Sequence, residues 1–226
     1  MKRTRLGLIV LAIAVVAVAA TLLARVYHAP AGDAHRQVRQ IILYYTLSRL
    51  DDPIIVVGDS IVEASTLPRS ICGHPIINAG LNGASTASDL GSWLTPALAN
   101  KRAASIIISL GVNDALVPAP TSKQAFEDRY AALLGELSKL STHLVVLAIA
   151  PVEARGRMTA EMQQEVMATV DGFNSILPAL AKRTNAAFMV LPEMPSPHTT
   201  DGVHLNSNGY QTWDKAVMQG AALACG

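Results

Sequence analysis

One serine of this chain lies where a reactive hydroxyl is expected. The run Ile54–Ser60 places four β-branched apolar residues, a glycine, Asp59 and Ser60 in succession. Four such residues between Pro53 and Gly58 are typical of a strand buried on both faces, as in a parallel sheet covered by helices. Ser60 would then begin a helix at the carboxyl edge of the sheet, where free backbone N–H groups can receive negative charge. An ordinary turn with a serine cap would have the same sequence pattern. The interpretation of Ser60 as reactive therefore needs support from other parts of the sequence.

Three further polar turns follow predicted strands. Asn78–Ser85 reads NAGLNGAS and Gly111–Asp114 reads GVND, each after an apolar run. Asp201–Asn206 reads DGVHLN and lies in the loop after the last predicted strand. Because the carboxyl ends of parallel strands meet at one edge of a sheet, we expect these turns to converge on Ser60.

Several other catalytic patterns are missing from the sequence. It contains no G-x-S-x-G elbow, no Walker loop, no G-x-G-x-x-G and no H-E-x-x-H. We therefore expect no metal and no cofactor.

Taken together, the four stretches resemble the SGNH hydrolases, also called the GDSL esterase/lipase family. Gly58–Ser60 matches the first block of that family, Gly83 the glycine of the second, Gly111–Asp114 the third and Asp201–His204 the fifth. The match covers residues 53 to about 215 in the expected order and spacing.

The resemblance implies a role for each matched residue. Ser60 would be the nucleophile, His204 its general base and Asp201 the carboxylate that orients His204. The chemistry is sound, because a serine hydroxyl is a poor nucleophile until an imidazole takes its proton. The resemblance also implies an oxyanion hole made of the N–H groups of Ser60 and Gly83 and the side-chain amide of Asn113. A glycine at position 83 would allow close approach of the backbone.

The implied function is that of a serine esterase acting on carboxylic esters. Short-acyl or O-acetyl esters of small molecules or glycans are the expected substrates. An O-acetyltransferase acting on an envelope polysaccharide would use the same residues, as would a lysophospholipase or a thioesterase. A non-catalytic binding domain is a remote alternative, which the intact set of Ser60, Asn113, Asp201 and His204 disfavours.

The elements that must position these residues alternate between strand and helix. Short connections and right-handed crossovers predict a flavodoxin-like three-layer α/β/α sandwich with a five-stranded, mostly parallel sheet. The five strands are predicted at residues 54–57, 75–78, 105–110, 143–149 and 187–191.

Helix signals occupy the gaps between these strands. A 3.6-residue apolar stripe from Phe126 to Leu140 follows a capping box at Thr121 and Gln124. Thr159 is expected to cap the next helix. The last helix should run from Ser207 to about Leu223.

The first 25 residues differ from the rest of the chain. Residues 6–24 are 19 residues without a charge, long enough to cross a bilayer as a transmembrane helix. We favour a membrane anchor, with a signal peptide cleaved after Ala17-Val18-Ala19 as the alternative. Lys2, Arg3 and Arg5 precede the span and favour a cytoplasmic amino terminus, which would place the catalytic domain outside the cytoplasm, in the periplasm.

Residues 26–50 are predicted to form a helical stem between this segment and an SGNH hydrolase-like domain at 51–226. Asp33 is a candidate cap for a helix that reaches Leu50. We expect the stem to pack on the domain rather than on a membrane surface. Its apolar side consists of Val38, Ile41, Ile42, Tyr45 and Leu50.

The charge of the chain disfavours nucleic acid as a partner. The first 25 residues hold four of the 18 basic residues, which leaves 14 against 17 acidic ones, a net charge of −3 for residues 26–226. No basic stripe is present. Nothing in the sequence indicates an oligomeric state.

Two cysteines, Cys72 and Cys225, complete the inventory of reactive groups. Cys72 precedes the second strand, and the last helix must run antiparallel to the strands. Both thiols should therefore lie at the edge of the sheet opposite the polar turns. Export would place them where disulfides persist. A bridge between them and a pair of free thiols both remain open.

Overall fold

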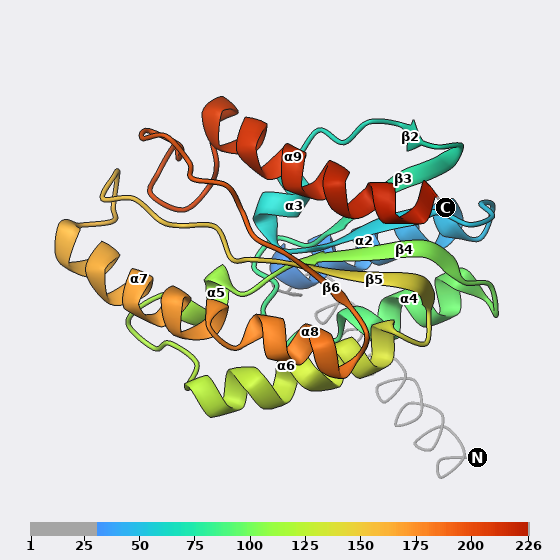
Figure 1. Cartoon of the computed structure of the whole chain (residues 1–226), viewed down its shortest axis with the longest axis horizontal. Helices are drawn as coiled ribbons and strands as arrows, with labels where there is room; N and C mark the ends of the chain where they lie inside the picture. Colours follow the sequence, from blue (N-terminus) through green and yellow to red (C-terminus); the bar gives the residue numbers. More distant parts are fainter. Residues whose placement is uncertain (1–30, 226) are drawn as a thin grey trace, which may run out of the picture. The chain divides into compact units, whose positions relative to one another are not determined.

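The computed structural model describes residues 31–225, with the elements arranged as in Figure 1. The chain divides into two compact units, Met1–Gln40 and Ile41–Gly226. The predicted span at residues 6–24 lies outside the described residues. Between residues 31 and 225, no helix is both long enough and apolar enough to cross a membrane.

A six-stranded sheet forms the centre of the unit Ile41–Gly226, in the order β2-β3-β1-β4-β5-β6. Neighbouring strands are parallel, except that β2 is antiparallel to β3. The strands are β1 (Ile54–Gly58), β2 (Ser70–Ile71), β3 (His74–Gly80), β4 (Ala103–Ser109), β5 (Ser141–Leu147) and β6 (Ala187–Met189). The five parallel strands have the predicted flavodoxin-like order. The prediction missed β2, because a two-residue strand carries no alternation to detect.

The two strands in the middle of the sheet have no solvent-facing side. Every residue of β1 and of β4 is buried. Buried faces on both sides explain why Ile54–Val57 is a continuous apolar run rather than an alternating one. These two strands form the buried centre of the sheet, and polar turns follow their carboxyl ends.

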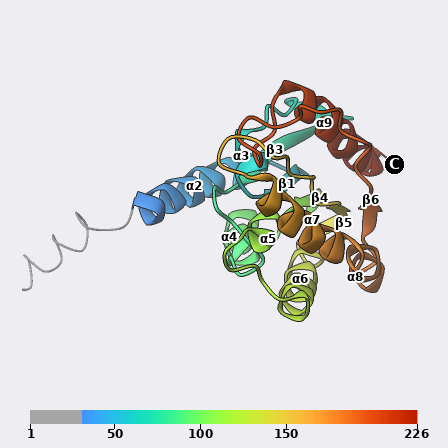
Figure 2. The ribbon, with the colours of Figure 1, turned by 90° about the vertical axis from the view of Figure 1, so that its left-hand side faces the viewer.

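Helices cover both faces of the sheet and complete the three layers (Figures 1 and 2). On one face, α9 packs across β4, β5 and β6. On the other lie α4, α6, α7 and α8. The helices are α2 (Ala31–Leu47), α3 (Ser60–Ala64), α4 (Leu90–Leu98), α5 (Val112–Ala115), α6 (Lys123–Leu137), α7 (Ala160–Asn174), α8 (Leu177–Arg183) and α9 (Ser207–Ala222), followed by the 3₁₀ turn η1 (Leu223–Cys225).

Of the four predicted helix starts, two are confirmed. The stem helix α2 begins at Ala31, so the predicted cap Asp33 lies inside it. The Thr159 hydroxyl accepts the N–H of Met162 at the start of α7, and α9 begins at Ser207. The cap of α6 is Ser122 rather than the predicted Thr121. The prediction was wrong by one residue because the Thr121 hydroxyl instead donates to Asp114 in α5.

The stem helix α2 packs through a different side from the one predicted. Leu43 and Leu47 are buried in the core, whereas Ile41, Ile42 and Tyr45 are exposed. The helix carries apolar residues on two opposite sides. Periodicity alone does not distinguish the side that faces a domain from the side that faces solvent.

A disulfide joins Cys72 to Cys225, whose Cα atoms are 5.6 Å apart. Cys72 lies in the turn between β2 and β3, and Cys225 ends η1. In Figure 1 the C-terminus and β2 lie at the same end of the sheet, away from the carboxyl ends of the parallel strands. Of the two alternatives left open by the sequence, the structure contains the bridge.

We expect the double variant Cys72→Ala/Cys225→Ala to lose stability but keep activity. The bridge spans 153 residues of chain, and its loss should lower the free energy of unfolding by about 2–4 kcal/mol, because the unfolded chain regains freedom. Urea unfolding without reductant measures this difference. The kcat/KM for an ester should stay at the wild-type level, because the bridge is at the far edge of the sheet. Equal stability of the two proteins would contradict the prediction.

Candidate active site

The predicted segments meet at the carboxyl edge of the sheet. Ser60 is the first residue of α3, directly after β1, and Asn113 lies in α5, just after β4. The N–H of Leu81, which leads from β3 toward Gly83, donates to the carbonyl of Gly58 at 2.9 Å. The loop before α9 adds Asp201 and His204, described next.

Ser60, His204 and Asp201 form one chain of hydrogen bonds. The Nε2 atom of His204 lies 3.0 Å from Oγ of Ser60, and its Nδ1 atom lies 2.7 Å from Oδ2 of Asp201. A proton on Nδ1 is donated to the carboxylate, which leaves Nε2 free to accept the Ser60 hydroxyl proton. This is the geometry that a Ser-His-Asp mechanism requires.

Local backbone geometry holds the Asp201 carboxylate in place. Its Oδ1 atom accepts the N–H groups of Val203 and His204 at 3.0 and 2.9 Å. Partial burial favours a higher pKa, but the hydrogen bonds from His204 and Val203 outweigh it and lower the pKa of Asp201 to about 2. Asp201 therefore stays ionised beside the imidazole at neutral pH.

Asp59 shapes the turn that presents Ser60. Its Oδ1 atom caps α3 by accepting the N–H of Ile61 at 2.9 Å. Burial raises the pKa of this carboxyl to about 7. The N–H of Ser60, the first residue of α3, has no acceptor within the helix. It is available to a negative charge beside the Ser60 hydroxyl.

Asn113 contacts the turn that carries Gly83. Gly83 has a φ of +74°, and a Cβ at this position would have no atom within 4 Å. The left-handed backbone at this position favours a glycine. The amide nitrogen of Asn113 donates to the carbonyl of Ala84 at 2.8 Å. An amide carries two N–H groups, so the second remains for a ligand.

Asp114 fixes the loops that hold these donors. The N–H and the hydroxyl of Thr86 donate to its two carboxylate oxygens at 2.9 and 2.6 Å. The hydroxyl of Thr121 adds a third hydrogen bond at 3.2 Å. Asp114 is buried, and it joins α5 to the turn that carries Thr86 and to the segment before α6 that carries Thr121.

Sequence analysis missed Tyr210, which connects α9 to α3. Its hydroxyl, on α9, donates to the carbonyl of Ile61 in α3 at 2.7 Å. Burial raises the pKa of Tyr210 to about 12, so the hydroxyl keeps its proton. Further along α9, the indole N–H of Trp213 donates to the hydroxyl of Ser109 at the end of β4. No feature of the sequence marked Tyr210, because its partner is 149 residues away.

Glu153 is a second residue that sequence analysis missed. Its Oε2 atom accepts the hydroxyl and the N–H of Thr199, both at 2.7 Å, and the N–H of His198 at 3.0 Å. Its Oε1 atom lies 3.2 Å from Nδ1 of His198. His198 lies in a loop, yet it is buried. Its partner is 45 residues earlier, so spacing did not reveal it.

Through these bonds, Glu153 clamps the base of the loop that carries His204. Thr199 pairs with Leu205 as an isolated β-bridge, and the N–H of Thr200 donates to the carbonyl of His204. Burial alone would raise the pKa of Glu153, but hydrogen bonds from the Thr199 and Ser196 hydroxyls and from backbone N–H groups lower it to about 2. The clamp is thus an ionised carboxylate with several donors.

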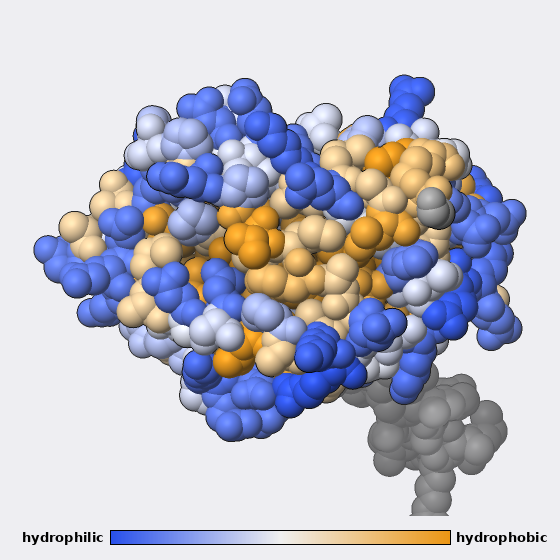
Figure 3. Space-filling view, in the orientation of Figure 1, coloured by the Kyte–Doolittle hydropathy of each residue, from blue (hydrophilic) through white to orange (hydrophobic). Residues whose placement is uncertain are grey.

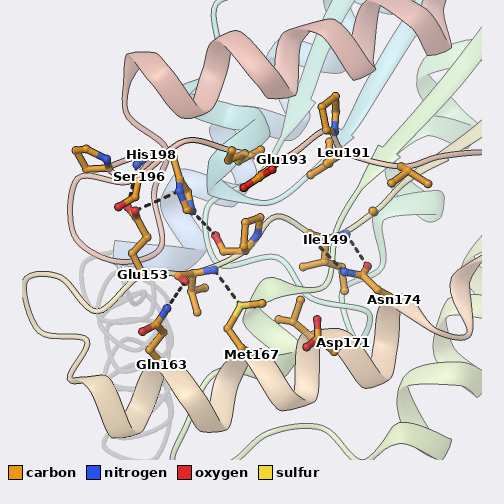
Figure 4. Close-up of a pocket in the computed structure, with 18 of the residues that line it drawn as sticks. Ile149, Glu153, Gln163, Met167, Asp171, Asn174, Leu191, Glu193, Ser196 and His198 are labelled. Atoms are coloured by element: carbon orange, nitrogen blue, oxygen red, sulfur yellow. Dashed lines mark hydrogen bonds and ion pairs between the residues drawn. The ribbon is translucent and has the colours of Figure 1, made fainter.

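A cavity of about 870 Å³ opens next to the clamp, between α7 and the loop after β6. Figure 4 shows Glu153 and His198 on its wall, and Figure 3 shows apolar side chains gathered on the same face, between α7 and α9. Ser60, Asp201 and His204 do not line it. The side chains of His204 and Asp201 are 45% and 53% exposed. The hydrogen-bonded chain of Ser60, His204 and Asp201 therefore lies outside this cavity, on a partly solvent-exposed part of the surface. We call this part of the surface the rim.

Within residues 31–225, no three His, Cys, Asp or Glu side chains are grouped so that they could hold a metal ion. The chemistry available at the rim is acyl transfer through a serine hydroxyl, with an imidazole as base and several N–H donors for an oxyanion.

A family model matches most of this chain. The GDSL-like lipase/acylhydrolase model matches residues 56–212, which include all five predicted site residues. The chain belongs to this family. A GDSL-like acylhydrolase is an ester-hydrolysing enzyme.

Solved structures share the fold of this GDSL-like acylhydrolase at low identity. A Streptococcus pneumonia protein, provisionally named a platelet activating factor, is 24% identical, with a TM-score of 0.67 over 91% of this chain and 99% of the other. A GDSL-like lipase from Bacteroides thetaiotaomicron is 16% identical, with a TM-score of 0.63 over 82% and 98%. The acetylxylan esterase Axe2 from Geobacillus stearothermophilus is 16% identical, with a TM-score of 0.55 over 75% and 94%. Comparison with curated proteins gave no match.

Glu153→Gln should destabilise the fold of the acylhydrolase, and the loss of stability should depend on pH. The variant loses an ionised acceptor of several hydrogen bonds, so its free energy of unfolding at pH 7 should fall by about 1–3 kcal/mol. Because folding lowers the pKa of Glu153 from 4.5 to about 2, its contribution is fully present above pH 4.5 and disappears as the pH falls toward 2. The difference between variant and wild type should therefore shrink from pH 7 to pH 3. Urea unfolding at both pH values measures it.

The matched control is Glu193→Gln, an exposed carboxylate that lines the same cavity. This variant should unfold like the wild type at both pH values. Equal losses in the two variants would show that Glu153 stabilises the domain through general charge rather than as a clamp.

Proposed function

We propose that this acylhydrolase is a serine esterase for short-acyl or O-acetyl esters, with Ser60 as nucleophile, His204 as base and Asp201 as the orienting carboxylate. The observation that carries the proposal is the continuous hydrogen-bonded chain through the three residues. No separate base is needed, because His204 already contacts the Ser60 hydroxyl.

In the proposed acylation step, Oγ of Ser60 attacks the ester carbonyl while Nε2 of His204 takes its proton. Negative charge develops on the carbonyl oxygen. The N–H groups of Ser60 and Gly83 and the free amide N–H of Asn113 would receive it. When the tetrahedral intermediate collapses, His204 donates its proton to the departing alcohol.

Deacylation repeats these steps with water in place of the serine hydroxyl. His204 takes a proton from water, and the resulting hydroxide attacks the acyl-serine. The Ser60 oxygen then leaves and recovers its proton from His204. Asp201 stays ionised throughout and stabilises the imidazolium formed in each half of the reaction.

The open position of the site supports a small acyl group on a larger alcohol. Half-exposed His204 and Asp201 side chains leave room for a bulky alcohol at the rim. The 870 Å³ cavity is not lined by any of the three residues, so it does not serve them directly as a tunnel for a long acyl chain. The fold shared with acetylxylan esterases agrees with an O-acetylated glycan as substrate.

We further propose that residues 6–24 tether the enzyme to a membrane, with the catalytic domain outside the cytoplasm, in the periplasm. The uncharged run is long enough for a span. The Cys72–Cys225 disulfide supports an oxidising compartment for the domain.

The proposed specificity predicts a strong preference for short acyl groups. The kcat/KM should be at least about tenfold higher for an acetyl than for a palmitoyl ester of the same alcohol, because no binding energy from a long chain would be used at the open rim. Kinetics with p-nitrophenyl esters and acetylated xylan test this. A preference for palmitoyl would overturn the assignment.

Ser60→Ala is the control for this assay. Its activity on the acetyl ester should fall below about 1% of the wild-type level, because the attacking atom is removed. An unchanged circular dichroism spectrum and melting temperature would show that the variant folds. Substantial residual turnover in the folded variant would rule out Ser60 as nucleophile.

Asn113→Ala should lower kcat by about 10²–10³ with little change in KM. The second amide N–H would act mainly on the charge of the transition state rather than on bound substrate. Steady-state kinetics on the acetyl ester separate the two parameters. If KM rose while kcat held, Asn113 would be a substrate-binding residue.

A further inference from the structure

The last part of α2 has two apolar sides, and the domain core uses only one of them. Leu43 and Leu47 are 2% and 0% exposed, whereas Ile41 and Tyr45 are 56% and 57% exposed. At 100° per residue, these two pairs point in nearly opposite directions from the helix axis. The outer side is therefore apolar for a reason other than packing within the domain.

This outer side is where exposed apolar residues concentrate. Seven large hydrophobic side chains are exposed among residues 31–225, and five of them belong to α2. We define the α2 outer face as the four that lie in the unit Ile41–Gly226, namely Ile41, Ile42, Tyr44 and Tyr45. A soluble surface does not usually gather its large apolar residues on one helix.

The composition of the α2 outer face suits the boundary between lipid and water. Tyr44 and Tyr45 contact each other edge to face, with ring centroids 5.5 Å apart. A tyrosine has an apolar ring and a polar hydroxyl, a combination that is enriched at membrane interfaces. Ile41 and Ile42 supply the purely apolar contact.

The chain before α2 indicates which apolar partner lies near the α2 outer face. The uncharged run ends at Ala24 and α2 begins at Ala31, so the two are at most about 25 Å apart even if the connection is fully extended. The outer face follows about 15–20 Å further along the helix. A bilayer that holds residues 6–24 is therefore always within reach of α2.

We propose that the α2 outer face lies on the lipid surface and docks the esterase domain against the membrane. This inference rests on the proposed tether through residues 6–24. The tether sets the distance of the domain from the bilayer, and the outer face would add a second contact, so that the domain is held against the surface. The ligand is the interfacial layer of a phospholipid bilayer.

The experiment places a fluorescent probe on this face in the full chain. Tyr45→Trp is reconstituted in phosphatidylcholine vesicles with or without bromine on the acyl chains, which quenches only tryptophans in contact with lipid. The matched control is Val190→Trp, a 70% exposed position after β6. Wild type, whose Trp93 and Trp213 are buried, provides the background. The emission added by Tyr45→Trp should fall by at least about half, and that added by Val190→Trp should not change.

Removing the apolar contact should remove the quenching. Adding Ile41→Ser and Ile42→Ser to Tyr45→Trp should restore emission in brominated vesicles, while hydrolysis of a soluble acetyl ester stays at the wild-type level. Carbonate extraction of the same vesicles tests the tether separately. If the chain resists extraction but Tyr45→Trp is not quenched, the tether stands and docking by the outer face is overturned.

The remaining outcomes are also decisive. If carbonate releases the chain yet Tyr45→Trp is still quenched, the tether fails and the docking surface stands. If carbonate releases the chain and no quenching occurs, both fail. Equal quenching of Tyr45→Trp and Val190→Trp would show contact without a preferred face and would overturn the proposal. Unquenched Tyr45→Trp that cross-links into dimers would assign the face to a second copy of the chain instead.

Discussion

A single hydrogen bond between Ser60 and His204 joins two segments that are 144 residues apart in the chain. Most of the domain can be understood as the support for that 3.0 Å contact. Strands β1 and β4 are buried on both faces and fix the position of Ser60. On the other side, α9 is anchored to β4 by Trp213 and to α3 by Tyr210, so the loop before it reaches Ser60 from a fixed base.

The sequence was sufficient to predict the residues that meet at this contact. Ser60, Gly83 and Asn113 lie shortly after the ends of β1, β3 and β4, and the order of parallel strands brings such turns to one edge. The family resemblance implied the role of each residue. Asp201 and His204 are three residues apart, so their pairing is local. The supporting residues could not be predicted in the same way. Glu153 and Tyr210 have partners 46 and 149 residues away, and neither lies at a spacing that periodicity can detect.

The α2 helix shows a different limit of sequence analysis. Both ends of the helix were predicted to within three residues, but the side that packs on the domain was predicted wrongly. Both sides are apolar, and only the shape of the domain decides that Leu43 and Leu47 enter the core. An amphipathic pattern normally identifies the buried side because the other side is polar. Where that contrast is absent, the pattern itself is informative, since an apolar side that the core leaves exposed implies contact with something else.

The carboxylates around the site explain why Asp201 is the partner of His204. Asp114 is occupied by Thr86 and Thr121. Asp59 lies near enough for His204 to influence its pKa, but burial raises that pKa to about 7, so near neutrality it carries a full charge only part of the time. Asp201 receives two backbone N–H groups and the imidazole, and its pKa falls to about 2. Of the carboxylates near the imidazole, Asp201 is thus the one that the surrounding donors keep both ionised and pointed at Nδ1. A short turn closed by its own N–H groups is enough to give one of several aspartates the role of orienting the base.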